Sequence, residues 1–313
     1  MPELPEVETI LRDLGPRLAG RRVTGARSSR LLRCIPSEAG RGAFPACLVG
    51  RRIVGARRRG KYLLLGLDDG RELLVHLGMT GRLVLESAAQ RAAKHLHLEL
   101  RLAGLNSVLR FYDPRRFGRV ALGRPEELAR RCGLGRLGLE PLEVSAAEIA
   151  RALGARAKRL KALLLEQTAV AGLGNIYADE ALWRSRLHPE RAASTLSAAQ
   201  ALELARHIRR VLGEAVRHRG SSVDDYVDGS GRPGSFQKRL RVYGREGLPC
   251  KRCGAKIVRL QVAGRSTHIC PQCQRRRPEA LRVRPGTWAG RATQVSGRTL
   301  TRRRGRRSPP AGS

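Results

Sequence analysis

The chain has 313 residues, of which 41% are apolar, and its 62 Lys and Arg residues outnumber 27 Asp and Glu to give a formal charge of +35. The apolar content is enough for a real core, and the length suggests roughly two domains. Because the chain has no run of about eighteen apolar residues and its N-terminus is acidic, we expect no membrane span and no secretory signal, hence a cytoplasmic protein. The excess of basic over acidic residues favours binding to polyanions, most plainly nucleic acid. The preference for Arg over Lys, 55 against 7, is explained more simply by codon bias.

The first predicted element is a helix that begins at Pro5, with Glu6 and Glu8 in its first turn. We expect Pro16 to bend or end it. The helix carries an apolar stripe at helical spacing, formed by Val7, Ile10, Leu11, Leu14 and Leu18.

Short β-like runs follow from about residue 22 to 122, separated by Gly and Asp turns. They predict a β-sandwich or partly open barrel in an N-terminal domain over 1–132. The clearest runs are 62–65, 72–75, 82–85, 97–102 and 107–111.

A Gly-rich stretch over 133–144 is predicted to be a linker, after which the apolar period becomes helical. Capping boxes at Ser145 and Ser197 each predict a helix start. Helices near 158–171 and 175–187 are joined by Gly172-Leu-Gly174, which predicts a helix–turn–helix within a domain over 145–236. This turn is expected to direct free backbone N–H groups at one point, where they could bind a phosphate. The alternative is that the helix–turn–helix places a recognition helix in the major groove.

The remaining chain divides by composition. Residues 220–236 predict a loop, with Asp224 and Asp225 as turn or cap residues. We then expect a short strand and the cysteine pairs over 237–274. The segment 275–313 is Arg-rich with few large apolar residues, which predicts a disordered basic tail.

Four of the seven cysteines are paired as Cys250-x-x-Cys253 and Cys270-x-x-Cys273. In a chain without a signal peptide, this spacing is typical of a tetrahedral Zn²⁺ site rather than of disulfides. All four positions are filled by protein, so one structural Zn²⁺ is expected.

The N-terminus carries a possible nucleophile. Removal of Met1 would leave Pro2 as a secondary amine, and terminal amines titrate near ~8, well below Lys. An unprotonated amine attacks an electrophilic sugar carbon to form a Schiff base, while Glu3 or Glu6 supplies a proton. From spacing alone, a plain helix start with a frayed Pro2 explains the same residues.

Five motifs, in order along the chain, change this balance. They are Met1-Pro-Glu-Leu-Pro-Glu-Val-Glu-Thr9, Arg59-Gly-Lys-Tyr62, His76-Leu-Gly-Met-Thr-Gly81, Asp113-Pro-Arg-Arg-Phe-Gly118 and Gln167-Thr-Ala-Val-Ala-Gly-Leu-Gly-Asn-Ile-Tyr-Ala178. With the four-cysteine finger they span residues 1–273, and this set resembles the bacterial formamidopyrimidine-DNA glycosylases. The resemblance implies an α+β multidomain fold: an N-terminal β-sandwich flanked by helices, a helix–two-turns–helix domain, and a C-terminal zinc-finger hairpin.

The resemblance also implies catalytic roles. Pro2 would be the Schiff-base nucleophile and Glu3 the proton donor at the sugar. Lys61 would contact phosphate and assist β-elimination, and Arg265 on the finger hairpin would grip phosphate and help δ-elimination. The alternative for Lys61 is a solvated lysine at a strand end without a catalytic role. The alternative for Arg265 is that it is simply one exposed arginine among many.

The DNA-binding residues follow in the same way. Met79, Arg115 and Phe117 match the wedge that fills the gap left by an everted nucleotide, although Met79 and Phe117 also suit a core. Other expected DNA contacts are His76, His95, Asn175 and Arg156. For His76, the alternative is a histidine with a purely structural role. Next to His95, Leu96 stands where the family's K-H-D-H motif has Asp.

Together these features predict a monomeric base-excision-repair enzyme acting on double-stranded DNA that contains oxidised purines or abasic sites. It would cleave the glycosidic bond and nick the strand by β,δ-elimination. The alternatives are an oxidised-pyrimidine glycosylase of the same family, disfavoured by Leu4, and a non-catalytic zinc-finger DNA-binding protein.

Overall fold

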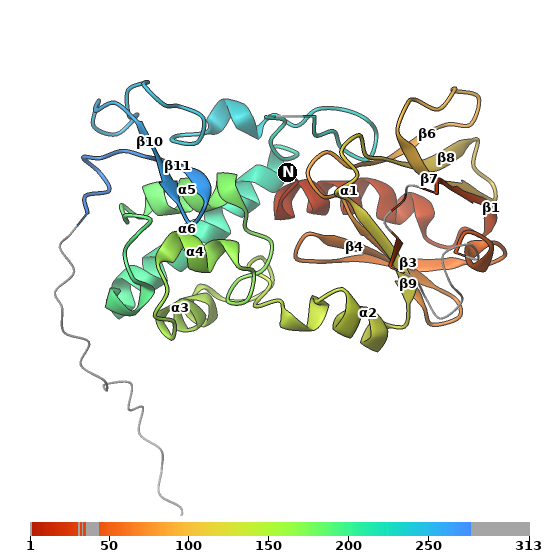
Figure 1. Ribbon diagram of the computed structural model, residues 1–313, viewed down its shortest axis with the longest axis horizontal. Coiled ribbons are helices and arrows are strands. Elements are labelled where there is room, and N and C mark those ends of the chain that lie inside the picture. Colours follow the sequence, from red (N-terminus) through yellow and green to blue (C-terminus); the bar gives the residue numbers. More distant parts are fainter. Residues whose placement is uncertain (1, 31, 33, 36–43, 224, 277–313) are drawn as a thin grey trace, which may run out of the picture. The chain divides into compact units, whose positions relative to one another are not determined.

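The computed structural model describes residues 2–30, 32, 34–35, 44–223 and 225–276 (Figure 1). The predictions for Asp224 and for the tail from residue 277 onward therefore lie outside the described residues. Among the residues that are described, no helix is both long and apolar enough to cross a bilayer.

Two sheets form the N-terminal sandwich, which confirms all five predicted β runs. The four-stranded sheet has the order β1-β7-β8-β6, and the five-stranded sheet has the order β2-β9-β5-β4-β3. Their bounds are β1 Val23–Ser28, β2 Cys34–Ile35, β3 Ile53–Arg59, β4 Tyr62–Leu67, β5 Glu72–His76, β6 Arg82–Ser87, β7 Leu96–Leu102, β8 Ser107–Tyr112 and β9 Arg119–Gly123.

Strand β4 shows why some of these runs are apolar throughout instead of alternating. Leu63 and Leu65 belong to the core between the sheets, whereas Leu64 packs on the opposite face with Leu128 of α2 (Pro125–Arg131). A strand buried on both faces has no solvent side to carry polar residues. Helices therefore flank the sandwich, as expected.

Helix α1 (Leu4–Leu18) begins one residue before the predicted start and continues for two residues beyond Pro16. Its stripe of Val7, Ile10 and Leu14 is buried in the sandwich core. Leu4, at its first turn, packs instead in the core of the helical domain. The start of α1 therefore joins the two halves of the protein.

The helical domain contains α3 (Ala146–Gly154), α4 (Leu160–Leu165), α5 (Asn175–Arg184) and α6 (Ala198–Arg217). The capping boxes predicted at Ser145 and Ser197 are both present. Short 3₁₀ turns lie at η1 Ala46–Leu48, η2 Leu134–Arg136, η3 Ala193–Thr195 and η4 Phe236–Arg239.

The helix predicted over 158–171 is wrong, because α4 ends at Leu165. Gln167 has a φ of 67° and Gly172 a φ of 86°, which no right-handed helix allows. Between them the backbone pairs with the predicted linker: the Leu139 N–H donates to the Ala169 carbonyl (3.1 Å), and the Ala171 N–H donates to the Leu139 carbonyl (2.9 Å).

The strand predicted directly after residue 236 is also wrong, since η4 and turns occupy that segment. The buried carboxylate of Glu180 accepts the backbone N–H groups of residues 241–243, which are therefore not free to join a sheet. The two strands of the finger, β10 (Val258–Val262) and β11 (Arg265–Ile269), lie between the cysteine pairs.

Candidate functional site

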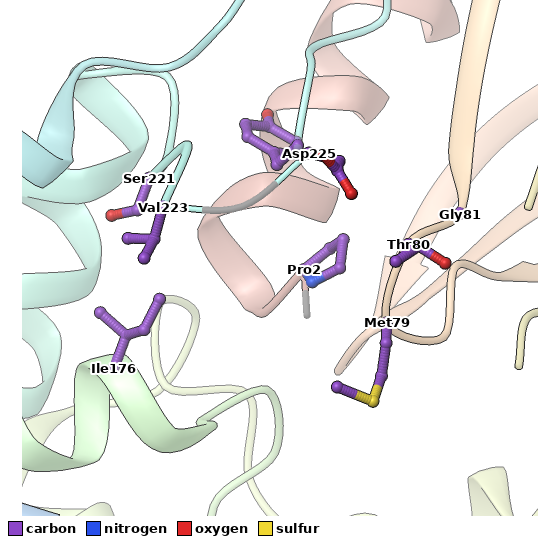
Figure 2. Close-up of a pocket in the computed structure, with 9 residues that line it drawn as sticks. Pro2, Met79, Thr80, Gly81, Ile176, Ser221, Val223 and Asp225 are labelled. Carbon is purple, nitrogen blue, oxygen red and sulfur yellow. The ribbon is translucent and has the colours of Figure 1, made fainter. Parts of the chain in front are cut away.

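Pro2 lies in a pocket built from four separate segments of the chain (Figure 2). The β5–β6 loop contributes Met79 on one side of the proline ring, and α5 contributes Ile176 on the other. Ser221, Val223 and Asp225 come from the predicted 220–236 loop. The structure thus gathers the predicted nucleophile, the predicted wedge methionine and the predicted 220–236 loop around one space.

Glu3 follows Pro2 in the chain and is 2% exposed. Its carboxylate accepts backbone N–H groups from Gly174 (2.6 Å) and Ile176 (2.9 Å) at the start of α5. The expectation that this turn offers these N–H groups to phosphate is therefore wrong: an internal carboxylate occupies the helix N-terminus. Burial raises the pKa of Glu3, against the opposing effects of Lys61 and of these N–H groups.

The two glycines of the Gly-Leu-Gly turn permit this close approach. A Cβ on Gly174 would lie 2.4 Å from Cδ of Glu3, and one on Gly172 would lie 2.6 Å from Cβ of Leu4. The Leu4 N–H donates to the Gly172 carbonyl at 3.0 Å. The glycines thus let the turn close directly on the N-terminus.

Glu6 forms a second buried carboxyl group beside Glu3. It accepts hydrogen bonds from the Tyr177 hydroxyl (2.5 Å), the Ser221 N–H (2.8 Å) and the Glu3 N–H (2.8 Å). Burial, reinforced by the charge of Glu3, raises the pKa of Glu6 to about 7. This carboxyl group joins α1, α5 and the 220–236 loop, and it is half protonated near neutral pH.

Lys61 follows the tight turn at Gly60 (φ 55°) and is 8% exposed. The turn is held by Glu140, whose carboxylate accepts the Gly60 N–H at 2.6 Å. Burial lowers the pKa of Lys61, and the positive charge of Arg265 lowers it further. The negative charges of Glu3 and Glu6 act in the opposite direction. Arg265 itself is exposed beside the Ala263–Gly264 turn of the finger hairpin. Three of the four predicted catalytic residues, Glu3, Lys61 and Arg265, therefore belong to one electrostatic cluster, and Pro2 precedes Glu3 in the chain.

The predicted wedge residues lie on two loops that are packed against each other. The Arg115 guanidinium stacks 4.9 Å from the ring centre of Phe117, which is 45% exposed, so Phe117 is not a core residue. Asp113 ties the loops together: it accepts the Thr80 hydroxyl and the Gly118 N–H, both at 2.6 Å. Asp113 opens the fourth motif, but the motif alone did not predict this role for it.

His76 and His95 differ in their surroundings. Nδ1 of His76 accepts the Gly78 N–H at 3.2 Å, and burial together with Arg119 and Lys61 lowers its pKa to about 4, so it is neutral. His95 is exposed, with a φ of 65°, and its carbonyl accepts the Asp113 N–H at 3.1 Å. Leu96, in place of the family's Asp, pairs with Tyr112 in the sheet.

Asn175 is the first residue of α5, and its Nδ2 donates to the Ser266 carbonyl of the finger hairpin at 2.8 Å. Its Oδ1 is buried without a hydrogen-bond partner among the described residues. Arg156 lies on the exposed segment after α3, and its charge contributes to lowering the pKa of Glu166. Among the described residues, no side-chain hydrogen bond or ion pair joins Arg156 to Glu3, Lys61 or Arg265, and its DNA contact stays a prediction.

The four cysteine sulfurs of the finger lie within 4.8 Å of one another, as a tetrahedral site requires. The knuckles pack on the helical domain through Trp183, which shares a small core with Cys250, Ile257 and Cys270. A buried network extends the contact: Lys161 pairs with Asp179, and Asp179 accepts the His268 N–H of β11 at 2.9 Å. One structural Zn²⁺ therefore fixes the hairpin that carries Arg265.

Three family models match the chain in order. The formamidopyrimidine-DNA glycosylase N-terminal domain covers residues 1–120, the formamidopyrimidine-DNA glycosylase H2TH domain covers 137–227, and the zinc finger found in FPG and IleRS covers 247–276. The chain belongs to the formamidopyrimidine-DNA glycosylase family. It is therefore a DNA glycosylase of base excision repair.

Curated members of this family are similar over almost their whole length. The formamidopyrimidine-DNA glycosylase of Heliobacterium modesticaldum is 47% identical over 282 residues, covering 88% of this chain and 100% of the relative. That of Pelotomaculum thermopropionicum is 44% identical, covering 88% and 99%.

Solved structures of the family agree with the fold. The MutM (FPG) protein of Thermus thermophilus has a TM-score of 0.77 at 44% identity, covering 88% of this chain and 100% of that one. A point mutant of the Lactococcus lactis FPG, solved with Fapy-dG-containing DNA, has a TM-score of 0.79 at 36% identity with the same coverage. These neighbours and the family models confirm the predicted fold class.

Proposed function

We propose that this glycosylase removes oxidised purines, 8-oxoguanine and formamidopyrimidines, from duplex DNA and then cuts the strand as an abasic-site lyase through Pro2. The observation that carries the proposal is the position of Pro2, which lines the pocket and is followed in the chain by buried Glu3, whose carboxyl group interacts electrostatically with buried Lys61. Relatives solved with Fapy-dG, with carbocyclic 8-oxo-G and with abasic-site DNA support this choice of substrate.

Removal of Met1 frees the Pro2 amine, whose nitrogen attacks C1′ of the damaged nucleotide. The glycosidic bond breaks, and the base leaves with its electron pair and takes up a proton. The sugar ring opens to an iminium ion on Pro2. Loss of a C2′ proton then expels the 3′ phosphate, a second elimination expels the 5′ phosphate, and water releases Pro2.

Glu3 supplies the proton that opens the sugar ring. Because burial raises its pKa, the carboxyl group holds a proton more readily than a solvated one, as a general acid must. The Glu6 carboxyl group accepts a hydrogen bond from the Glu3 N–H. Because its pKa is raised to about 7, Glu6 is a second carboxyl group that can hold a proton at neutral pH. Lys61, with a pKa lowered by burial, pairs with the phosphate beside the lesion and assists β-elimination, and Arg265 assists δ-elimination.

Strand distortion is the role proposed for the two wedge loops. Everting a nucleotide costs a few kcal/mol of stacking, and an apolar wedge recovers part of this. Met79 and the stacked pair of Arg115 and Phe117 fill the gap, with Arg115 facing the unpaired base. Neutral His76, His95, Asn175 and Arg156 are proposed to hold the DNA backbone.

The oligomeric state, the cellular location and the role of zinc are part of the same proposal. The enzyme works as a monomer in the bacterial cytoplasm, where its DNA substrate lies. Zn²⁺ holds the finger hairpin and takes no part in the reaction.

Single-turnover nicking of 8-oxoguanine:C and thymine glycol:A duplexes tests the substrate assignment. We expect faster nicking of the 8-oxoguanine duplex, and a Glu3→Gln variant that binds this duplex but loses base excision. Faster nicking of thymine glycol would assign the chain to the pyrimidine branch of the family. Tight lesion binding without any strand cleavage would show a non-catalytic binder.

A further inference from the structure

A second hollow lies at the base of the 220–236 loop and shares no lining residue with the Pro2 pocket. Its volume is about 430 Å³. Because a water molecule takes up about 30 Å³, a hydrated phosphodiester fits within it. The lining residues are His218, Ser235, Lys238, Arg239, Arg241 and Lys251.

The charge of this hollow is uncompensated. Its two lysines and two arginines are exposed, and among the described residues no carboxylate lies within ion-pair distance of any of them. Helix α6 ends at Arg217, and the next residue, His218, lines the hollow. Three carbonyls at this helix end already accept backbone N–H groups and do not compete for the cations: those of Ala215, Val216 and His218.

The hollow is close to the reaction centre along a short path. Ser221 lines the Pro2 pocket, and the neighbouring Ser222 hydroxyl accepts the Gly234 N–H at 2.9 Å. Gly234 in turn precedes Ser235, which lines the hollow. With ~3.8 Å between consecutive Cα atoms, the two serines at either end are at most about 15 Å apart. A DNA strand advances ~3.4 Å per nucleotide, so the path spans at most about four nucleotides.

We propose that this basic hollow binds a backbone phosphate of the duplex within about four nucleotides of the lesion, as a flanking contact separate from the reaction centre. This inference rests on the proposed DNA substrate but not on the chemistry at Pro2. Lys238 and Arg239 belong to η4, Arg241 follows it, and Lys251 lies between Cys250 and Cys253 of the finger. A phosphate bound there would therefore join the base of the 220–236 loop to the finger. The contact lengthens the footprint without reading sequence.

The test is a double variant, Lys238→Ala with Lys251→Ala, which removes one cation from each side of the hollow. Its matched control is Arg151→Ala with Arg206→Ala, which removes the same charge from exposed positions on α3 and α6. Equilibrium binding is measured on an 8-oxoguanine:C duplex with long flanks and on two duplexes shortened on one side or the other. The readout is binding, so a failure of the proposed chemistry would appear separately, as absent nicking.

We expect the test variant to bind the long duplex roughly three- to tenfold more weakly, as exposed ion pairs imply. The slope of log K against log salt should fall by about 0.9, the contribution of one phosphate contact. One of the shortened duplexes should abolish the difference between variant and wild type. Equal losses in the control variant, an unchanged salt slope, or a loss that persists on both shortened duplexes would overturn the proposal.

Discussion

Replacing Glu6 by glutamine should change how the stability of the protein depends on pH. The pKa of Glu6 is raised from 4.5 to about 7 in the folded protein, mainly by burial. As pH rises above 4.5, the unfolded chain loses this proton first, so the folded state is penalised progressively up to about pH 7 and by a constant amount above it. A difference of this size costs about 3 kcal/mol of unfolding free energy. Glu6→Gln has no proton to lose, so it should lack this decline.

Urea unfolding of both proteins between pH 5 and pH 8, with zinc present, measures the effect. Glutamine also disturbs the bonds to Tyr177, Ser221 and Glu3, which shifts the variant's stability by about 1–3 kcal/mol at every pH. The informative quantity is therefore the slope of the unfolding free energy against pH, and not its absolute value at any one pH. Glu143→Gln, which removes an exposed carboxyl group, is the control and should follow wild type. Parallel profiles for Glu6→Gln and wild type would refute the reasoning.

Three further changes probe other parts of the site. Gly174→Ala should slow base excision at least tenfold while duplex binding persists, because its Cβ displaces the Glu3 carboxyl; unaltered single-turnover rates would contradict the close approach at this turn. Asp113→Ala should lower the unfolding free energy by about 1–3 kcal/mol and weaken duplex binding, since it leaves the Thr80 hydroxyl and the Gly118 N–H unpaired; an equal affinity for the lesion duplex would argue against its role in the wedge. Chelation of zinc should abolish duplex binding and alter the fluorescence of Trp183, which packs on the knuckles, while circular dichroism retains the β signal; retained binding would show that the finger is dispensable.

Local patterns were sufficient for the sandwich strands and the capped helices. Runs such as 82–85 and 107–111 carry their own turn signals, and both capping boxes satisfy helix ends within four residues. The two errors in secondary structure arose where distant residues decide the backbone. The strand expected after residue 236 is replaced by turns because Glu180, far earlier in the chain, captures its N–H groups.

The same reasoning explains which site residues were found. Pro2, Glu3 and Lys61 stand in contiguous motifs, so the sequence displays them directly. The use of the α5 N-terminus by Glu3 could not be predicted, because it joins residues 171 positions apart. Glu140 acts through partners that only folding brings near, and its neighbours in the chain do not distinguish it from an ordinary surface acid. Asp113 stands in a family motif, but its bond to Thr80 joins two loops and is not visible in that motif.

The identity of the covalent nucleophile is the central claim, and borohydride trapping tests it most directly. The enzyme is incubated with an 8-oxoguanine:C duplex, reduced, digested, and analysed by mass spectrometry to locate the crosslinked peptide. The account predicts a crosslink on the nitrogen of Pro2 in a chain that has lost Met1. A crosslink on Lys61, or none at all with a processed N-terminus and bound DNA, would contradict it.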